Sequence, residues 1–248
     1  EVSSPRAPIA TVNISLGTTA STKTMSAGTA FTTTVDGTSY QFVTIGDITA
    51  SNTGSSVPFD SVNIYEGSYV TTRYTVDTSD VDQTFTLGDA NADTSTLTVK
   101  VQTSSSDTST TTYTKATDIT QLANNSTVYF LQEVEGGKFE VYFGDGVVSK
   151  AVEDGNIVSL SYVVTNKSEA NGASSFTAPS TIGGQTDITL TTILAQWRHA
   201  RTQRAQRRIA ICMTRPPTTV FRGRTKRYEF EFILYRGTTR SFDLNTVP

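Results

Sequence analysis

Polar and hydrophobic residues alternate in many short segments of the chain, and a period of two residues is typical of β-strands with one buried face. Such segments recur about every 8–12 residues and are separated by Gly, Asn, Asp and Ser, which favour turns. The pattern predicts a mainly β protein with antiparallel, sandwich-like or barrel-like domains. The clearest alternating positions are Val12, Ile14 and Leu16, then Leu97, Val99 and Val101, and then Val158, Leu160, Tyr162 and Val164.

Turn-forming dipeptides lie between several of these segments. Asp36-Gly37 predicts a two-residue hairpin, because both residues tolerate the left-handed backbone that such a turn needs. Glu66-Gly67 and Gly136-Gly137 are each expected to be the turn between two neighbouring strands. The Thr-rich stretch 102–114 has two interpretations: a linker, or an edge strand with a loop tip. We favour the edge strand, because strand-like segments flank it closely.

The character of the sequence changes after Gly184. Residues 186–213 are the only helix-like stretch, with Ile193, Trp197 and Ala200 at helical spacing. The single Trp, the single His and the single Cys all lie beyond residue 190. The pattern predicts a short helical, basic C-terminal segment that departs from the β-rich part of the chain.

The charge of the chain is divided in the same way. Residues 1–189 hold 8 Lys or Arg and 20 Asp or Glu, for a net charge of −12, whereas residues 190–248 hold 12 and 3, for a net charge of +9. This asymmetry is typical of a separate tail or domain. Three interpretations stay open: the segment binds nucleic acid through clustered Arg, it pairs with the acidic β-region or an acidic partner, or it is an out-of-frame translation.

These observations predict three regions. Residues 1–30 are expected to be an N-terminal leading segment that packs on the β-region. Residues 31–185 are the β-rich region, with a candidate break between subdomains near 125–135. Residues 186–248 are the atypical basic segment. One Cys allows no intrachain disulfide, and no run of 18 apolar residues predicts a membrane span. The missing initiator Met indicates a fragment or a processed product.

Residues 144–150 come close to the phosphate-binding pattern G-x-x-x-x-G-K. The second glycine is replaced by Ser149, and Ala151 stands where a magnesium-binding hydroxyl is needed. A strand-like segment follows, although a phosphate loop requires a helix whose N-terminus binds the anion. We therefore expect a strand-to-strand connection in which Gly144, Gly146 and Gly155 serve the backbone geometry.

Other candidate chemistry is weak, and we predict no catalytic, metal-binding or cofactor-binding residues. Calcium binding by the aspartates lacks the order of an EF-hand loop. A glycosidase pair of carboxylates would share a face of a strand but has no aromatic cleft signature around it. A Cys-His nucleophile would have to come from the atypical segment. The residues concerned are Asp77, Asp80, Asp82, Asp89 and Asp93, then Glu133 and Glu135, and then His199 and Cys212.

Seven segments in a fixed order carry a resemblance to a known family. They read VNIYEGSYV, DQTFTL, ADTSTLTVKVQTS, YTKATDI, VYFLQE, FEVYFGDGVVSKAVEDGNIVSLSYVVTN and EANGASSF. Over about residues 25–190 the chain resembles the large baseplate wedge subunit of T-even-type contractile phages, within the baseplate J-like family. The most specific residues form a turn motif: Phe143, Gly144, Asp145, Gly146, Asp154, Gly155, Asn156, Asn171 and Gly172.

The resemblance implies a structural, non-enzymatic role in the virion. It implies a protein that joins baseplate wedges into the inner ring around the hub and relays the rearrangement that triggers sheath contraction. The implied partners are other wedge and hub proteins and a second copy in the assembled wedge, with assembly in the host cytoplasm. No nucleic acid, membrane or small-molecule substrate is expected. Ser149 and the pair Lys167-Ser168 depart from the family pattern, and so does the segment after residue 190. A Thr-rich surface adhesin or receptor-binding domain is the alternative.

Overall fold

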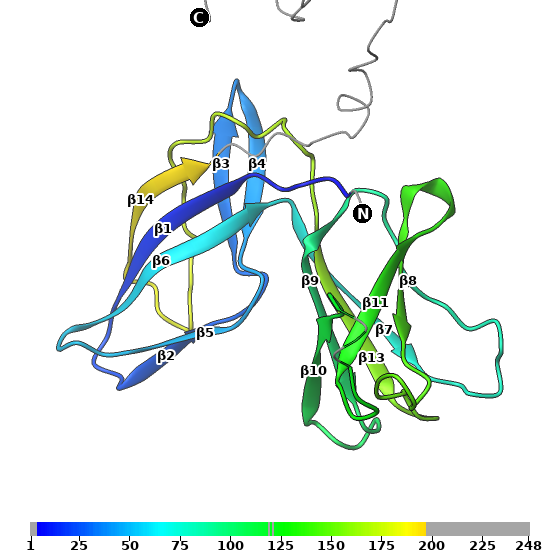
Figure 1. Ribbon diagram of the computed structural model, residues 1–248. Helices are drawn as coiled ribbons and strands as arrows, with labels where there is room; N and C mark the ends of the chain where they lie inside the picture. Colours follow the sequence, from blue (N-terminus) through cyan, green and yellow to red (C-terminus); the bar gives the residue numbers. More distant parts are fainter. Residues whose placement is uncertain (1–3, 119, 121, 197–248) are drawn as a thin grey trace, which may run out of the picture. The chain divides into compact units, whose positions relative to one another are not determined.

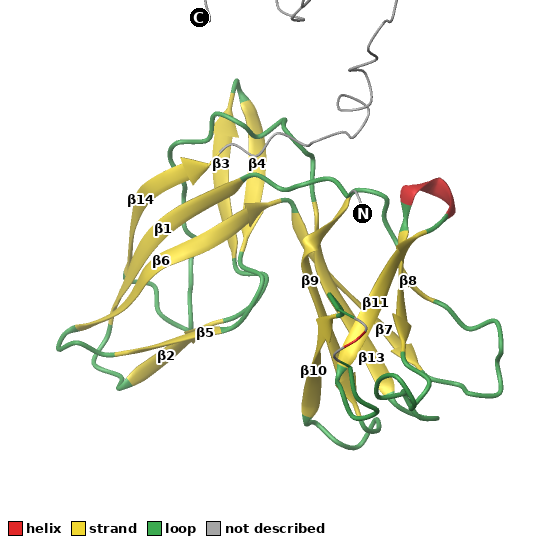
Figure 2. Ribbon diagram, in the orientation of Figure 1, coloured by secondary structure: helices red, strands yellow, loops and turns green. Residues whose placement is uncertain are grey.

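The computed structural model describes residues 4–118, 120 and 122–196, which fold into β-sheets connected by turns and loops. Figure 2 shows strands throughout this part of the chain, with helical turns only in short connections. A five-stranded sheet and a two-stranded sheet make up what we call the first module, and a seven-stranded sheet makes up the second module. Each module has its own hydrophobic core. The prediction of a mainly β protein is confirmed.

The first module is built from strands at both ends of the described chain (Figure 1). Its larger sheet has the order β14-β1-β6-β4-β3, and all of its pairings are antiparallel. A separate two-stranded antiparallel sheet of β2 and β5 completes the module. The strands are β1 (Ile9–Gly17), β2 (Thr22–Met25), β3 (Ala30–Val35), β4 (Thr38–Val43), β5 (Ile48–Ser51), β6 (Ser56–Glu66) and β14 (Ile188–Gln196).

The core of the first module lies where the alternating pattern of β1 places it. Val12, Ile14 and Leu16 are buried and belong to one cluster with Phe31 and Phe42. Ala10, on the same face of β1, belongs to the cluster too, whereas Thr11, Asn13 and Ser15 lie outside it, because period-two alternation sends every second side chain to the other face. The predicted buried face of β1 is confirmed.

The second module is a curved sheet with the order β7-β13-β9-β10-β11-β12-β8. Its pairings are antiparallel except between β10 and β11, which run parallel. The outermost strands meet, because Tyr74 of β7 contacts the ring of Phe85 in β8 and donates a hydrogen bond to the Thr86 carbonyl at 2.6 Å. The sheet therefore approaches a closed barrel. Its strands are β7 (Ser68–Thr75), β8 (Phe85–Leu87), β9 (Ala92–Gln102), β10 (Thr110–Lys115), β11 (Val128–Glu133), β12 (Phe139–Phe143) and β13 (Ile157–Val164).

The core of the second module confirms two further alternating segments. Val99 and Val101 of β9 are buried together with Val158, Leu160 and Tyr162 of β13. The Tyr162 hydroxyl accepts a hydrogen bond from the Gly88 amide at 3.0 Å, so its polar end is satisfied inside the core. Leu97 and Val164 are partly buried and pack against the same cluster.

Two of the three predicted hairpin turns are confirmed. Asp36 and Gly37 both have positive φ, 50° and 82°, and join β3 to β4 with Val35 opposite Thr38. Gly136-Gly137 lies in a short 3-10 turn, η2 (Glu135–Gly137), between the antiparallel strands β11 and β12. Glu66-Gly67 is not a hairpin turn, because β6 pairs with β1 and β4 while β7 pairs with β13. The chain passes there from the first module to the second.

Three further expectations need correction. Residues 188–196 are not helical but form β14, which pairs with β1 from Ile9 opposite Gln196 to Leu16 opposite Ile188. Tertiary pairing thus overrides the helical spacing around Ile193. The leading segment 1–30 contains β1, which is hydrogen-bonded to β6 on one side and β14 on the other. Strand β10 is not an edge strand, because it lies between β9 and β11.

Candidate functional site

The loop after β12 is held by hydrogen bonds from its own residues. The Asp145 carboxylate accepts hydrogen bonds from the amides of Val147 and Val148 at 2.9 and 3.2 Å, and the Gly146 amide donates to the Ser149 carbonyl at 2.9 Å. These backbone hydrogen bonds lower the pKa of Asp145. A phosphate loop would need such amides free to bind the anion. Here two of them are bonded to the carboxylate of the loop itself.

Gly144 occupies a position with no room for a side chain. A Cβ atom there would collide with the side chain and backbone of Ser149, whose hydroxyl is buried and has no hydrogen-bond partner. Ser149 stands where the phosphate-binding pattern requires glycine, and its hydroxyl lies directly against the Cα of Gly144. The loop is therefore closed on itself at its base.

The second turn of the motif connects three loops of the second module. The Asp154 carboxylate accepts a hydrogen bond from the Thr78 amide at 3.1 Å, and the Asn156 side chain donates to the Thr103 carbonyl at 3.0 Å. The backbone of Asn156 accepts a hydrogen bond from the Val76 amide at 2.8 Å. These bonds tie the loop before β13 to the loops after β7 and β9.

The last pair of the motif lies in the segment that returns to the first module. The backbone amide of Asn171 donates to the Ser168 carbonyl at 3.1 Å. The side-chain oxygen of Asn171 is buried and has no hydrogen-bond partner. Gly172 has a φ of 113°, and a Cβ there would approach Val35 of β3 at 3.3 Å. The structure does not bring this pair together with the loop after β12. Whether the nine motif residues act as one set stays a prediction.

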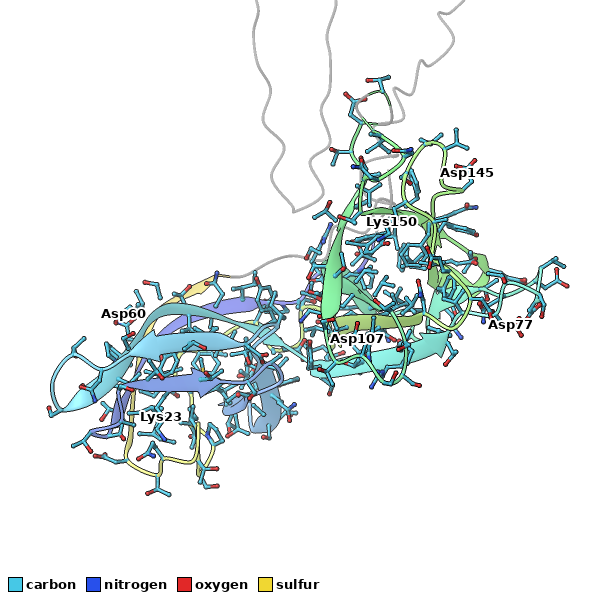
Figure 3. The ribbon with its side chains drawn as sticks, turned by 90° about the horizontal axis from the view of Figure 1, so that it is seen from below. Lys23, Asp60, Asp77, Asp107, Asp145 and Lys150 are labelled. Atoms are coloured by element: carbon cyan, nitrogen blue, oxygen red, sulfur yellow. The ribbon has the colours of Figure 1, made fainter. Side chains whose placement is uncertain are left out.

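The carboxylates considered for metal binding or catalysis lie in separate settings. Asp77 accepts hydrogen bonds from Ser79, and these lower its pKa. Asp77, Asp107 and Asp145 are spread over different loops of the second module in Figure 3. Among the described residues, no group of three or more His, Cys, Asp or Glu is placed to hold a metal ion.

The sequence predicted that Glu133 and Glu135 share a face of a strand, and this prediction is wrong. Strand β11 ends at Glu133, and Glu135 begins the 3-10 turn that follows. His199, Cys212 and the rest of the basic segment from residue 197 onward lie outside the described residues. In the part of the chain that is described, no helix is long and apolar enough to cross a membrane.

A buried carboxylate that sequence reasoning missed lies where the chain passes between the modules. Glu66, the last residue of β6, is fully buried, and its carboxylate accepts hydrogen bonds from the Thr165 hydroxyl at 2.6 Å, the Asn166 amide at 2.9 Å and the Asn166 side chain at 2.7 Å. Burial raises the pKa of Glu66 despite these donors, and the charge of Glu169 acts in the same direction.

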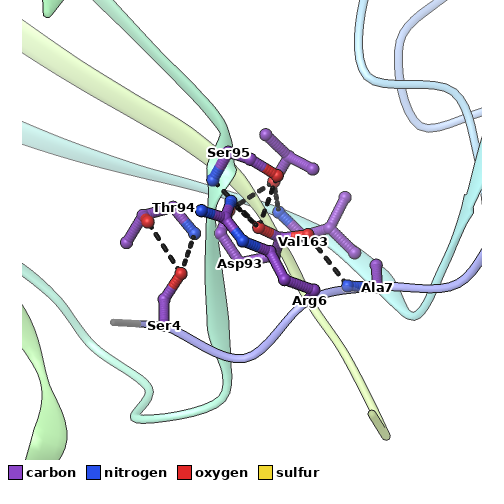
Figure 4. A network of polar contacts seen from close by, with 8 residues as sticks. Ser4, Arg6, Ala7, Asp93, Thr94, Ser95 and Val163 are labelled. Carbon is purple, nitrogen blue, oxygen red and sulfur yellow. Dashed lines mark hydrogen bonds and ion pairs between the residues drawn. The ribbon is translucent and has the colours of Figure 1, made fainter. Parts of the chain in front are cut away.

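A second buried carboxylate connects the N-terminal segment to β9 (Figure 4). Asp93 accepts a hydrogen bond from the Ala7 amide at 2.9 Å and forms an ion pair with Arg6 at 3.0 Å. Nearby, the Ser4 and Thr94 hydroxyls are hydrogen-bonded at 2.7 Å. The sequence pattern offers Asp93 only as a weak candidate for calcium binding. It instead fixes the segment that leads into β1 against the second module.

The described residues thus form a two-module β-protein whose hydrogen-bonded carboxylates lie in turns and at the passage between the modules. Residues 71–174 match the family model described as bacteriophage baseplate wedge protein gp6, third domain. The matched segment begins in β7 and ends shortly after β13, so it contains nearly all of the second module. No protein in a search of curated sequences matches the chain.

The family match confirms the resemblance to the baseplate wedge subunit over residues 71–174. It supports a structural role in a phage baseplate and a location in the tail of the virion. The family is structural, which points to a non-enzymatic protein that interacts with other baseplate proteins.

Proposed function

We propose that this chain is a scaffold of a contractile-tail baseplate wedge. In this role it joins neighbouring wedges into the inner ring around the hub and relays the rearrangement that triggers sheath contraction. Its partners are other wedge and hub proteins and a second copy of the chain, and assembly takes place in the host cytoplasm before the virion is complete. The observation that carries the proposal is the family match over residues 71–174.

The geometry of the second module supports a scaffolding role. Exposed hydrophobic side chains stand on loops that are held by internal hydrogen bonds: Val147 is 75% exposed and Val81 is 92% exposed. The amide of Val147 is bonded to Asp145, and the amide of Asp82, next to Val81, is bonded to Asp80. A loop that is already ordered loses little conformational entropy when a partner binds. These two positions are therefore suited to report on contacts with neighbouring proteins.

The test places a photo-crosslinking amino acid at Val147 or Val81 of the protein in intact virions. The control position is Asp60, an exposed residue of β6 in the first module. We expect crosslinks from the second module to other tail proteins, and a crosslink between two copies if the wedge contains a dimer. Crosslinks that differ between extended and contracted tails would support the relay. Crosslinks identical in both states would refute it.

Immunogold labelling separates the scaffold from the adhesin alternative. An antibody raised to residues 60–165 should label virions at the baseplate end of the tail. Label on fibres or on a cell surface would overturn the scaffold proposal in favour of a receptor-binding domain. We also propose that the motif from Phe143 to Gly172 serves turns and not ligand binding, and that residues 31–185 are the β-rich region that corresponds to the wedge subunit.

A further inference from the structure

The chain crosses between the two modules twice, and the two crossings lie against each other. The outward crossing passes through Glu66 and Gly67, and the return crossing follows Val164 at the end of β13. A Cβ atom at Gly67 would collide with the Val164 carbonyl, so the two backbones touch at this point. Gly67 also donates its amide to the Gln41 carbonyl at 2.9 Å, which anchors the crossing to β4.

The side chain of Glu66 bonds the two crossings to each other. Its carboxylate accepts from three donors on Thr165 and Asn166, and the Thr165 hydroxyl in turn accepts from the Lys167 amide at 2.9 Å. The Glu66 amide donates to the Pro8 carbonyl at 2.9 Å, so the residue also holds the segment before β1. Removing a buried acceptor of this kind leaves its donors unsatisfied, which is costly in a dry site.

Apolar packing between the modules is small beside these polar contacts. The cluster at the junction contains three buried residues, Ala7, Val43 and Val163, whereas the cores of the first and second modules contain fifteen and twelve. Hydrophobic stabilisation scales with the apolar area removed from water. Each core can therefore hold its own module, while the connection between modules combines this small cluster, on which Ala30, Ile45, Tyr65 and Tyr69 also pack, with the buried carboxylates.

We propose that Glu66 and Asp93 form a two-point joint that makes the stability of each module depend on the other. Glu66 binds the return crossing to the end of β6, and Asp93 binds Arg6 and Ala7 to the beginning of β9. With both carboxylates in place, opening of one module strains the other. With both neutralised, each module opens on its own. This inference concerns the chain alone and does not rest on its role in a baseplate.

The test measures whether damage in the second module is transmitted to the first. Val141→Ala removes buried methyl groups from β12 and should speed hydrogen exchange of second-module amides by on the order of tenfold or more. In the otherwise unchanged protein, we expect the amides of β1 in the first module to exchange faster as well. In the background E66Q/D93N, the same Val141→Ala change should leave the exchange of β1 unaffected.

The control background is E133Q, which makes the same chemical change as E66Q at an exposed strand end. It should transmit the effect of Val141→Ala as fully as the unchanged protein does. If E66Q/D93N does not fold, the milder pair Thr165→Val and Arg6→Gln removes one donor from each joint. Equal transmission to β1 with and without the joint would overturn the proposal, and so would no transmission in the unchanged protein.

Discussion

Replacing Gly146 by Val isolates the conformational demand of the loop after β12. Gly146 has a φ of 84°, in the left-handed region that side chains disfavour. A Cβ atom there would meet only the Cβ of Ala151 at 3.9 Å, which is ordinary van der Waals contact. Space is therefore available, and the cost comes from the backbone.

The magnitude follows from the backbone term. The left-handed conformation costs an L-residue about 1–2 kcal/mol, and a β-branched side chain lies at the upper end. We expect Gly146→Val to lower the free energy of unfolding by about 2 kcal/mol, which for a chain of this size lowers the melting temperature by about 4–8 °C. Asn tolerates the left-handed region, so Gly146→Asn should cost about 1 kcal/mol or less.

Urea and thermal unfolding of the two variants beside the unchanged protein measure this difference. Equal stabilities for Gly146→Val and Gly146→Asn would refute the assignment of the cost to φ. Nucleotide binding is measured on the same samples. A Gly146→Val variant with unchanged stability and a lost nucleotide-binding signal would show that the loop is a ligand site.

Three further predictions concern single side chains. Tyr162→Phe should lower the free energy of unfolding by about 1–3 kcal/mol, because the Gly88 amide loses its acceptor in the core; a urea midpoint equal to that of the unchanged protein would contradict this. The folded pKa of Asp145 lies below its ordinary value of 3.8, so its stabilisation is complete above pH 3.8 and is lost as the pH falls through the lower folded pKa. The difference in melting temperature from Asp145→Asn should shrink over that range, and a constant difference would exclude the effect. Burial raises the pKa of Glu66 above 4.5, with Glu169 adding to the shift, so the stabilisation is complete below pH 4.5 and is lost as the pH rises through the raised pKa. The unchanged protein should lose stability relative to E66Q across that window, whereas parallel pH profiles would show that the folded pKa of Glu66 is not raised.

The strands could be predicted from the sequence where one face is buried and the other is solvated. Val12, Ile14 and Leu16 show this alternation, and Asp36-Gly37 marks its own hairpin because both residues accept positive φ. Glu66-Gly67 looks the same locally, yet the strands around it pair elsewhere. Partner choice depends on contacts far apart in the sequence, and no local pattern records it.

Strand β14 escaped the prediction because the segment of residues 188–196 fits two patterns. Ile188 and Leu190 alternate with threonines, as a strand requires, and both pack against the core of the first module. Ile193 also stands at helical spacing from residues further along, and the Arg-rich sequence that follows favoured the helix. A long-range pairing with β1 decides between the two.

The buried carboxylates could not be distinguished from ordinary turn residues. Asp77, Asp93 and Asp107 are each followed two residues later by Ser, and all three accept hydrogen bonds from that Ser. Asp77 is exposed and Asp107 half-buried, while Asp93 is 1% exposed because Arg6 and Ala7 cover it. The covering residues lie more than eighty positions away. Only the folded arrangement therefore distinguishes the buried Asp93 from the more exposed Asp77 and Asp107.

The pairing of β1 with β14 sets an order on biosynthesis. The ribosome delivers β1 well before β14, so its hydrogen-bonding partner on one side is complete only when residue 196 has emerged. All strands of the second module are available once Val164 has been made. The second module can therefore fold during translation while the first sheet still has an open edge, and such an edge invites pairing with other chains. A nascent chain stalled between residues 164 and 188 would be the most prone to aggregate.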